Sequence, residues 1–87
     1  MASYKLVFKK SVSKDFRSIA HADVVSIVQR IDALVVDPRP DGSEKLSGQE
    51  RYRVRQGVYR IIYEVMDELL IVTVVKVGHR KQVYKRS

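Results

Sequence analysis

Residues 49–84, QERYRVRQGVYRIIYEVMDELLIVTVVKVGHRKQVY, decide the fold of this chain. The stretch predicts three β-strands followed by a short basic and aromatic tail. Its turn residues predict two tight connections, one at Gln56 and Gly57, where glycine supplies positive φ, and one at Asp67 and Glu68. The last strand is almost continuously apolar, which is typical of a strand inside a sheet. The expected strands span residues 51–55, 58–66 and 69–77.

Arginine recurs along this stretch where a sheet face would otherwise be neutral or apolar. Tyr52 and Val54 share one face of the first strand, so the alternate positions share the other: Arg51, Arg53 and Arg55. A two-residue turn at Gln56 and Gly57 sets Arg53 opposite Arg60, and like charges directly opposed destabilise a sheet. We therefore interpret this face as a surface that binds a polyanion, RNA above all. A slip of one residue in the register would exchange the two faces.

The second hairpin extends this surface toward the tail. With its turn at Asp67 and Glu68, Val77 lies opposite Val58, and Arg80 lies on the side of Arg55. One turn further along, Tyr84 reaches the same rim. A solvated basic face is the ordinary alternative for such residues. The predicted site comprises Arg53, Arg55, Arg60, Arg80 and Tyr84.

The chain begins with a predicted strand and a short helix. Residues 3–9 alternate apolar and mostly charged side chains, which indicates a half-buried strand. Residues 12–20 carry an apolar stripe at helical spacing, and either Ser11 or Ser13 is suited to cap this helix.

A second, longer helix follows a brief turn at His21 and Ala22. Asp23 is its expected N-cap, and its end is expected near Asp37, because Pro38 disfavours helix in the residue before it. The two helices would form a hairpin that packs on the sheet. The apolar stripe of the longer helix comprises Val24, Ile27, Val28, Ile31, Leu34 and Val35.

Composition narrows the class of protein. The 87 residues contain no internal repeat, which predicts a single domain over residues 1–87. The absence of cysteine excludes disulfides and thiolate metal sites and fits a reducing cytoplasm. The longest apolar run, residues 69–75, is too short to cross a bilayer, and the N-terminal MASYKLVFKKS lacks the apolar core of a signal peptide. We expect a cytoplasmic location and no membrane partner.

Charge favours acidic partners. The formal net charge is +7, from 17 lysines and arginines against 10 acidic residues, and the basic excess lies in the strand half. The sequence has no P-loop, no glycine-rich phosphate cradle and no Cys/His cluster, so a metal-dependent nuclease is not expected.

Residues 45–84, KLSGQERYRVRQGVYRIIYEVMDELLIVTVVKVGHRKQVY, resemble the RelE/ParE superfamily of toxins from bacterial and archaeal type II toxin–antitoxin pairs. The most specific phrases are Leu-x-Gly, Tyr-Arg-Val-Arg, Tyr-Arg-Ile-Ile-Tyr-Glu and the closing Val-Gly-His-Arg and Val-Tyr. The resemblance covers nearly the whole chain. It implies an α+β, RelE-like fold: an N-terminal strand and a two-helix hairpin packed on a mainly antiparallel four-stranded sheet.

Within the superfamily these phrases look like the RelE branch, whose members cut mRNA in the ribosomal A site without a metal or cofactor and so inhibit translation. The mRNA 2′-hydroxyl attacks the adjacent phosphate, leaving a cyclic phosphate and a free 5′-hydroxyl. The resemblance implies that Arg55 and Arg60 bind the phosphoryl oxygens. It also implies that Arg80 protonates or stabilises the leaving 5′ oxygen. Tyr84 would stack on a base or orient the 2′-hydroxyl.

The general base is the open point in this chemistry. Family members often carry lysine where this chain has Arg53 and Arg55, and arginine effectively cannot lose its proton. Histidine is better suited to proton transfer near neutrality, which makes His79 a secondary candidate. The secondary candidates for contact with RNA are Lys45, Arg51, His79 and Lys81.

The resemblance further implies a cognate RelB-like antitoxin, with operator DNA contacted only through that complex. The acidic or amphipathic tail of the antitoxin would wrap the basic sheet or displace the tail that carries Tyr84. Two alternatives stay open. A ParE-like toxin would share the fold and inhibit DNA gyrase without nuclease activity, and a non-catalytic basic module would only bind RNA.

Overall fold

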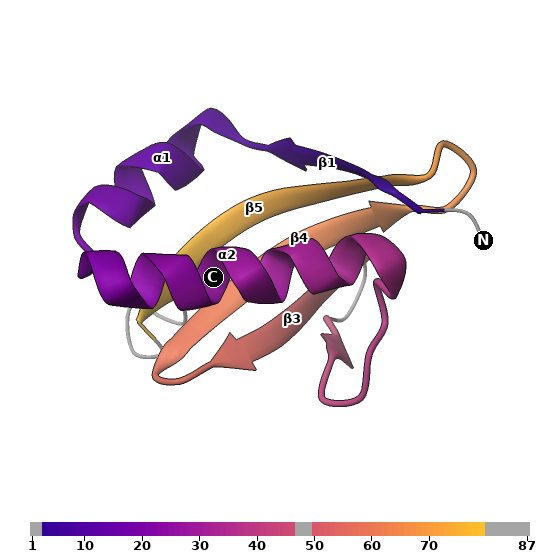
Figure 1. Cartoon of the computed structure of the whole chain (residues 1–87). Coiled ribbons are helices and arrows are strands. Elements are labelled where there is room, and N and C mark those ends of the chain that lie inside the picture. The colour runs from indigo at the N-terminus through magenta and orange to yellow at the C-terminus, as the bar shows by residue number, and fades with distance from the viewer. Residues whose placement is uncertain (1–2, 47–49, 80–87) are drawn as a thin grey trace.

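Two helices cover one face of a mainly antiparallel sheet in the computed structural model, which describes residues 3–46 and 50–79 (Figure 1). The sheet has five strands within these ranges, in the order β1-β5-β4-β3-β2, and only β1 and β5 run parallel. The predicted α+β class is confirmed, with one strand more than expected. The elements are β1 (Lys5–Phe8), α1 (Lys10–Arg17), α2 (His21–Val36), β2 (Glu44–Lys45), β3 (Arg51–Gln56), β4 (Tyr59–Met66) and β5 (Ile71–His79).

The turn between β3 and β4 lies one residue further along than predicted. Gln56 pairs with Tyr59, so the two turn residues are Gly57 and Val58, and Gly57 has φ +61°. A turn with positive φ only at its first central residue is of the II′ kind, which places glycine first. Each residue of β3 therefore meets a partner two positions beyond the predicted one. A shift of two leaves every side chain on its predicted face.

The connection between β4 and β5 is longer than the predicted two residues. Met66 pairs with Ile71, so residues 67–70 form the turn, and Leu70 has φ +54°. The amide of Leu70 donates a hydrogen bond to the carbonyl of Asp67, which closes the turn. The longer turn and a register shift between Ile62 and Tyr63 together place Val77 opposite Ile61 instead of Val58.

An irregularity in β5 keeps its apolar side chains in the core. The register with β4 shifts between Ile62 and Tyr63, so Val75 is an extra residue between the partners Val74 and Lys76. Such a bulge exchanges the faces along a strand. Val74 and Val77 are both buried, and Lys76 is exposed. The strand is flanked by β1 and β4, as its apolar sequence predicted.

Both helices begin earlier than predicted. Lys9 precedes α1 as its N-cap and makes no side-chain cap, so neither Ser11 nor Ser13 has the predicted capping role. The helix ends at Arg17, short of the predicted residue 20. The backbone hydrogen bonds of α2 begin at Ala20, whose carbonyl accepts hydrogen bonds from the amides of Asp23 and Val24. Asp23 thus lies in the first helical turn, where its charge suits the helix dipole, and does not cap it.

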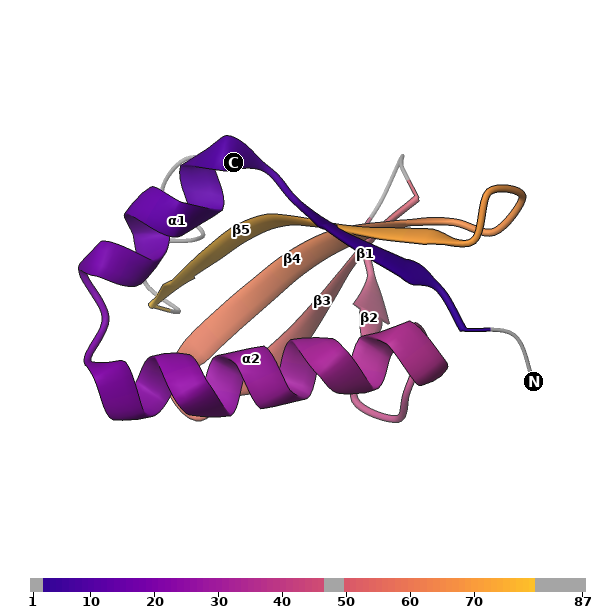
Figure 2. The ribbon, with the colours of Figure 1, turned by 45° about the horizontal axis from the view of Figure 1, so that its top comes forward.

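The α2 helix crosses the sheet, while α1 packs beside β5 (Figure 2). The α2 helix ends at Val36, with Asp37 as its C-cap, as the position of Pro38 predicted. Neither α1 nor α2 has the length and hydropathy of a membrane-spanning helix. The buried core combines residues from both helices and the three long strands: Val12, Ile27, Ile31, Leu34, Tyr52, Val54, Ile61, Tyr63, Val65, Val72, Val74 and Val77.

Candidate nucleic-acid interface

Among the described residues, four arginines lie on the sheet face opposite the helices, and we call it the arginine face. Tyr52 and Val54 of β3 are buried in the core, so their strand neighbours point to the other side. The predicted separation of Tyr52 and Val54 from the arginines of β3 is confirmed, because Tyr52 and Val54 are core residues. The arginine face comprises Arg51, Arg53 and Arg55 of β3 and Arg60 of β4.

Arg55 and Arg60 are direct cross-strand partners at the turn end of this face. The predicted pair was Arg53 and Arg60, and it is wrong because the II′ turn moves each partner by two positions; Arg53 instead lies opposite Ile62. Arg60 is only 9% exposed, whereas Arg55 is exposed. Two adjacent cations, one of them buried, form a strong attraction for an anion, because charges interact more strongly where water is excluded.

Glu44 brings a carboxylate to the same face. It lies opposite Arg53 across β2 and β3 and accepts a hydrogen bond from the Arg53 guanidinium. This hydrogen bond, together with the charges of Arg53, Arg55 and Arg60, lowers the pKa of Glu44 below its ordinary value. The sheet therefore holds one anion of its own beside the predicted RNA site.

Two of the secondary candidates are engaged in ion pairs. The Nε of Arg51 donates to an oxygen of its cross-strand partner Glu64 at 2.8 Å. The Nζ of Lys45 lies 3.2 Å from a carboxylate oxygen of Glu50. Because both cations have a carboxylate beside them, they offer less net charge to a polyanion than Arg55 does.

The structure places His79 away from the arginine face. It pairs with Tyr59 across β4 and β5, and the two rings meet edge to face at 6.2 Å between centroids. Tyr59 packs against the core, so His79 shares the helix-covered side of the sheet. The partner of Arg60 on β5 is Gly78, the residue before His79. The other predicted tail residues, Arg80, Lys81 and Tyr84, lie outside the described residues.

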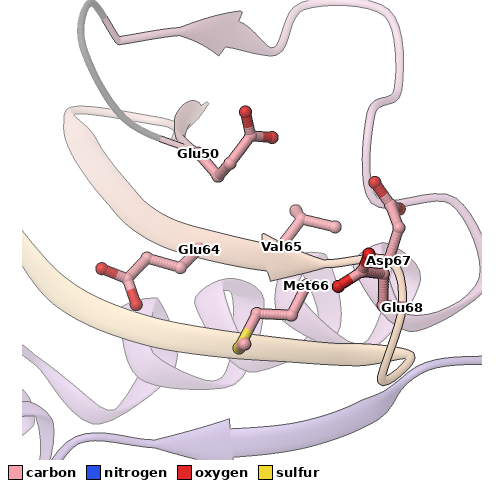
Figure 3. Close-up of a pocket in the computed structure, with 6 residues that line it drawn as sticks. All are labelled: Glu50, Glu64, Val65, Met66, Asp67 and Glu68. Atoms are coloured by element: carbon pink, nitrogen blue, oxygen red, sulfur yellow. The ribbon is translucent and has the colours of Figure 1, made fainter.

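A cavity on another part of the surface is lined by acidic side chains, in contrast to the arginine face. It has a volume of about 540 Å³ near the β4–β5 turn, and the described residues that line it include four carboxylates (Figure 3). Three of the four are paired with basic side chains outside the lining, those of Arg39, Lys45 and Arg51. Within residues 3–46 and 50–79, no group of three or more His, Cys, Asp or Glu side chains is placed to hold a metal ion. The acidic cavity is lined by Glu50, Glu64, Val65, Met66, Asp67 and Glu68.

Two residues at the site were not found from sequence. Glu44 follows the proline- and glycine-rich turn, in a strand too short to show alternation. Arg30 lies among the buried positions of α2, between Ile27 and Ile31, and lines a cavity with Arg55. The one signal in the sequence that could have indicated Arg30 is its position as a single cation beside the apolar stripe of the helix.

The family described as "ParE toxin of type II toxin-antitoxin system, parDE" matches residues 6–84. This chain belongs to that family of type II toxins. The predicted resemblance to the RelE/ParE superfamily is thereby confirmed.

Curated relatives and solved structures are of the RelE kind. The mRNA interferase toxin RelE of Escherichia coli K12 is 24% identical over 82 residues, which cover 92% of this chain and 86% of the relative. The isolated E. coli RelE toxin superposes with a TM-score of 0.77 at 27% identity, covering 95% of this chain and 93% of that one. A chain of the archaeal RelE–RelB complex from Pyrococcus horikoshii superposes with a TM-score of 0.77 at 26% identity, covering 90% of this chain and 96% of that one. The chain is a RelE-like toxin of the type II toxin–antitoxin class.

Proposed function

We propose that this toxin is a ribosome-dependent endoribonuclease that cuts mRNA in the A site. The observation that carries the proposal is the pairing of Arg55 with the buried Arg60 on the arginine face. Both guanidinium groups can bind phosphoryl oxygens through paired N–H groups, and a phosphate bound by both offsets the repulsion between like charges opposed on a sheet. Relatives named mRNA interferase RelE support the same activity.

The proposed reaction uses groups of the RNA and cations of the protein. The 2′-oxygen forms a bond to the adjacent phosphorus as the bond from phosphorus to the 5′-oxygen breaks. The 2′-hydroxyl loses a proton, the leaving 5′-oxygen gains one, and the products are a cyclic phosphate and a 5′-hydroxyl. Arg55 and Arg60 stabilise the charge that grows on the phosphoryl oxygens, and donors already fixed in place do this most effectively.

Arg53 positions the RNA backbone in this proposal and is itself held by Glu44. Its guanidinium is a poor general base because arginine keeps its proton. His79 lies on the other side of the sheet, against Tyr59, so we leave it out of the chemistry. We keep the proposed role of Arg80, which is to protonate or stabilise the leaving 5′-oxygen. Tyr84 keeps its proposed role of stacking on a nucleobase or orienting the 2′-hydroxyl. Positioning and charge stabilisation then account for most of the rate.

We further propose that a RelB-like antitoxin binds this toxin and that operator DNA is contacted only through their complex. RelE proteins are seen together with RelB in the complex from P. horikoshii. An acidic or amphipathic segment of the antitoxin would suit the arginine face, because opposite charges favour association.

The test is to add the purified protein to translating ribosomes and to map the 5′ ends of the mRNA by primer extension. We expect cuts in phase with codons, at a rate that drops sharply in Arg55→Ala, Arg60→Ala, Arg80→Ala and Tyr84→Ala. Arg17→Ala removes an exposed arginine of α1 and serves as the matched control. Intact mRNA with the wild-type protein would refute the proposal.

Inhibition of DNA gyrase is the second candidate function, because the matching family is described by its ParE members. A supercoiling assay with the same protein preparations separates the two. Loss of supercoiling while mRNA stays whole would establish the gyrase activity. Binding to RNA with neither effect would leave a non-catalytic RNA-binding module.

A further inference from the structure

A cavity lies at the edge of the sheet beside Arg55, and we call it the edge cavity. β2 pairs only with Tyr52 and Arg53, so within the described ranges β3 has no strand beside it at Arg55. The space of about 360 Å³ next to that edge is largely open to solvent, and its lining includes two arginines from different elements. The edge cavity is lined by Arg30, Gly42, Ser43, Glu44 and Arg55.

Arg30 reaches the edge cavity from α2, on the helix side of the sheet. Its terminal nitrogen lies 3.9 Å from the place where a Cβ on Gly42 would stand, in ordinary van der Waals contact. Gly42 has φ +91°, a backbone conformation that glycine adopts without strain, and this turn carries the chain around the guanidinium. Arg30 is thus fitted into the wall of the cavity by the loop that also supplies Glu44.

Neither arginine of the edge cavity makes an ion pair within residues 3–46 and 50–79, although Glu44 also lines the cavity and the charge of Arg55 lowers the pKa of this carboxyl group. The Nε of Arg30 is buried and has no hydrogen-bond acceptor in that part of the chain. Arg55 makes no ion pair there either, because the nearby carboxylate of Glu44 is bound to Arg53. Buried donors are normally satisfied, so the Arg30 guanidinium, which lines the cavity together with the exposed Arg55, suits an acceptor that comes from outside.

We propose that the edge cavity binds a phosphate group of the RNA strand, next to the phosphate that lies at Arg55 and Arg60. This inference rests on the proposed function and adds Arg30 to it as an RNA-binding residue. Arg55 belongs to both the edge cavity and the arginine face, so the cations form a continuous track: Arg30, Arg55 and Arg60. A single-stranded nucleic acid carries a negative group on every nucleotide, and proteins follow it with such a basic track.

The experiment measures binding of a short RNA that carries a 2′-O-methyl group at each position, which prevents cleavage. Fluorescence anisotropy at several salt concentrations compares the wild-type protein with Arg30→Gln and with Arg17→Gln, an exposed arginine of α1. We expect Arg30→Gln to weaken binding roughly 3- to 10-fold and to reduce the salt slope by about 1, as for a lost phosphate contact. Arg17→Gln should change the affinity by less than about 2-fold.

A second measurement needs no variant and so does not depend on the folding of one. The Nε–Hε NMR resonance of Arg30 in the wild-type protein should shift on addition of the same RNA. Equal RNA affinity and salt slope in the two variants, with no shift of this resonance, would overturn the proposal. A shift caused by an acidic peptide and not by the RNA would overturn it in favour of a protein carboxylate as the occupant.

The outcome for the proposed function is distinguishable from the outcome for the edge cavity. Intact mRNA on ribosomes together with weaker RNA binding by Arg30→Gln would refute the nuclease and support the phosphate position. Codon-phased cleavage together with equal binding by Arg30→Gln and Arg17→Gln would support the nuclease and refute the phosphate position.

Discussion

The carboxylate of Glu44 on β2 accepts a hydrogen bond from the guanidinium of Arg53 on β3, its direct cross-strand partner. The two side chains are 57% and 14% exposed, so an arginine with little access to water is capped by a carboxylate that has much more. The pKa of Glu44 is lowered first by this hydrogen bond and then by the charges of Arg53, Arg55 and Arg60. In the proposed RNA complex, Glu44 would compete with a phosphate for the same donors.

Substitution of Glu44 should tighten RNA binding. Glu44→Gln keeps the shape of the side chain and removes its charge, so Arg53 becomes more available to a phosphate. We expect the affinity for a non-cleavable RNA to rise roughly 3- to 10-fold, in the range of one hydrogen-bonded contact. Fluorescence anisotropy at fixed salt measures the change.

The matched control is Glu50→Gln, which makes the same change in charge at an exposed residue paired with Lys45. Equal gains in the two variants would mean that net charge alone is at work. A weaker affinity in Glu44→Gln would instead show that Glu44 positions Arg53 for RNA.

Arg60 should need its fork of N–H groups as well as its charge. Arg60→Lys retains the charge but cannot bind two phosphoryl oxygens in the same fixed geometry. We expect the single-turnover rate of mRNA cleavage on ribosomes to fall roughly 100-fold, the size of effect seen when one donor to a developing oxyanion is lost. Affinity for RNA should change far less than this rate.

Arg51→Lys is the control for this substitution, because Arg51 lies on the same face and is held by Glu64. Thermal denaturation checks that both variants fold. If both lose the same fraction of the rate, the special role of Arg60 is wrong.

Membership of the arginine face was predictable because it depends only on the two-residue period of a strand. The turn at Gly57 shifted the partners by two, and a shift of two preserves faces. The identity of the opposed pair was not predictable in the same way. It depends on which of two adjacent turn positions glycine takes, and the sequence around Gln56 and Val58 allowed both.

The β4–β5 turn was not predictable, because the contacts that hold it are distant in sequence. Asp67 accepts hydrogen bonds from Tyr4, 63 residues away, and from Arg39, 28 residues away. These partners fix Asp67 outside the strand, and Leu69 and Leu70 stay exposed although their sequence pattern is that of a buried strand. Local periodicity carries no information about such contacts.

Acid should weaken the fold through Asp67. Arg39 donates two hydrogen bonds to its carboxylate, at 2.7 and 3.1 Å, and Tyr4 donates a third at 2.6 Å. These contacts, those of Arg39 first, lower the pKa of Asp67 below its ordinary 3.8. A folded-state pKa below the unfolded one stabilises the fold above the unfolded value, and this contribution is lost as pH falls through the folded value.

We therefore expect the urea midpoint of the wild-type protein to be steady from neutrality to about pH 5 and to fall in stronger acid. Asp67→Asn should unfold at lower urea at neutral pH and lose less of its midpoint on acidification. Glu68→Gln, at the neighbouring exposed turn position, should keep the wild-type profile. Parallel profiles of wild type and Asp67→Asn below pH 4 would contradict this role of Asp67.

Tyr63 should stabilise the core through its hydroxyl as well as its ring. It is 0% exposed, its ring stacks on that of Tyr52 at 5.8 Å, and its hydroxyl donates a 2.6 Å hydrogen bond to the carbonyl of Pro38. Tyr63→Phe keeps the packing and leaves that buried carbonyl without this donor. We expect a loss of about 1–3 kcal/mol in the free energy of unfolding at neutral pH, measured with urea.

The same hydroxyl should make stability depend on pH in alkali. Burial raises the pKa of Tyr63 from its ordinary 10.0 to about 12. A raised folded-state pKa stabilises the fold below the unfolded value, and the contribution is lost as pH rises from 10 through 12. Wild type should therefore lose more stability across this range than Tyr63→Phe, so that the two unfolding curves converge. Curves that keep their neutral-pH separation up to pH 12 would mean that Tyr63 ionises as freely in the folded protein as in the unfolded chain.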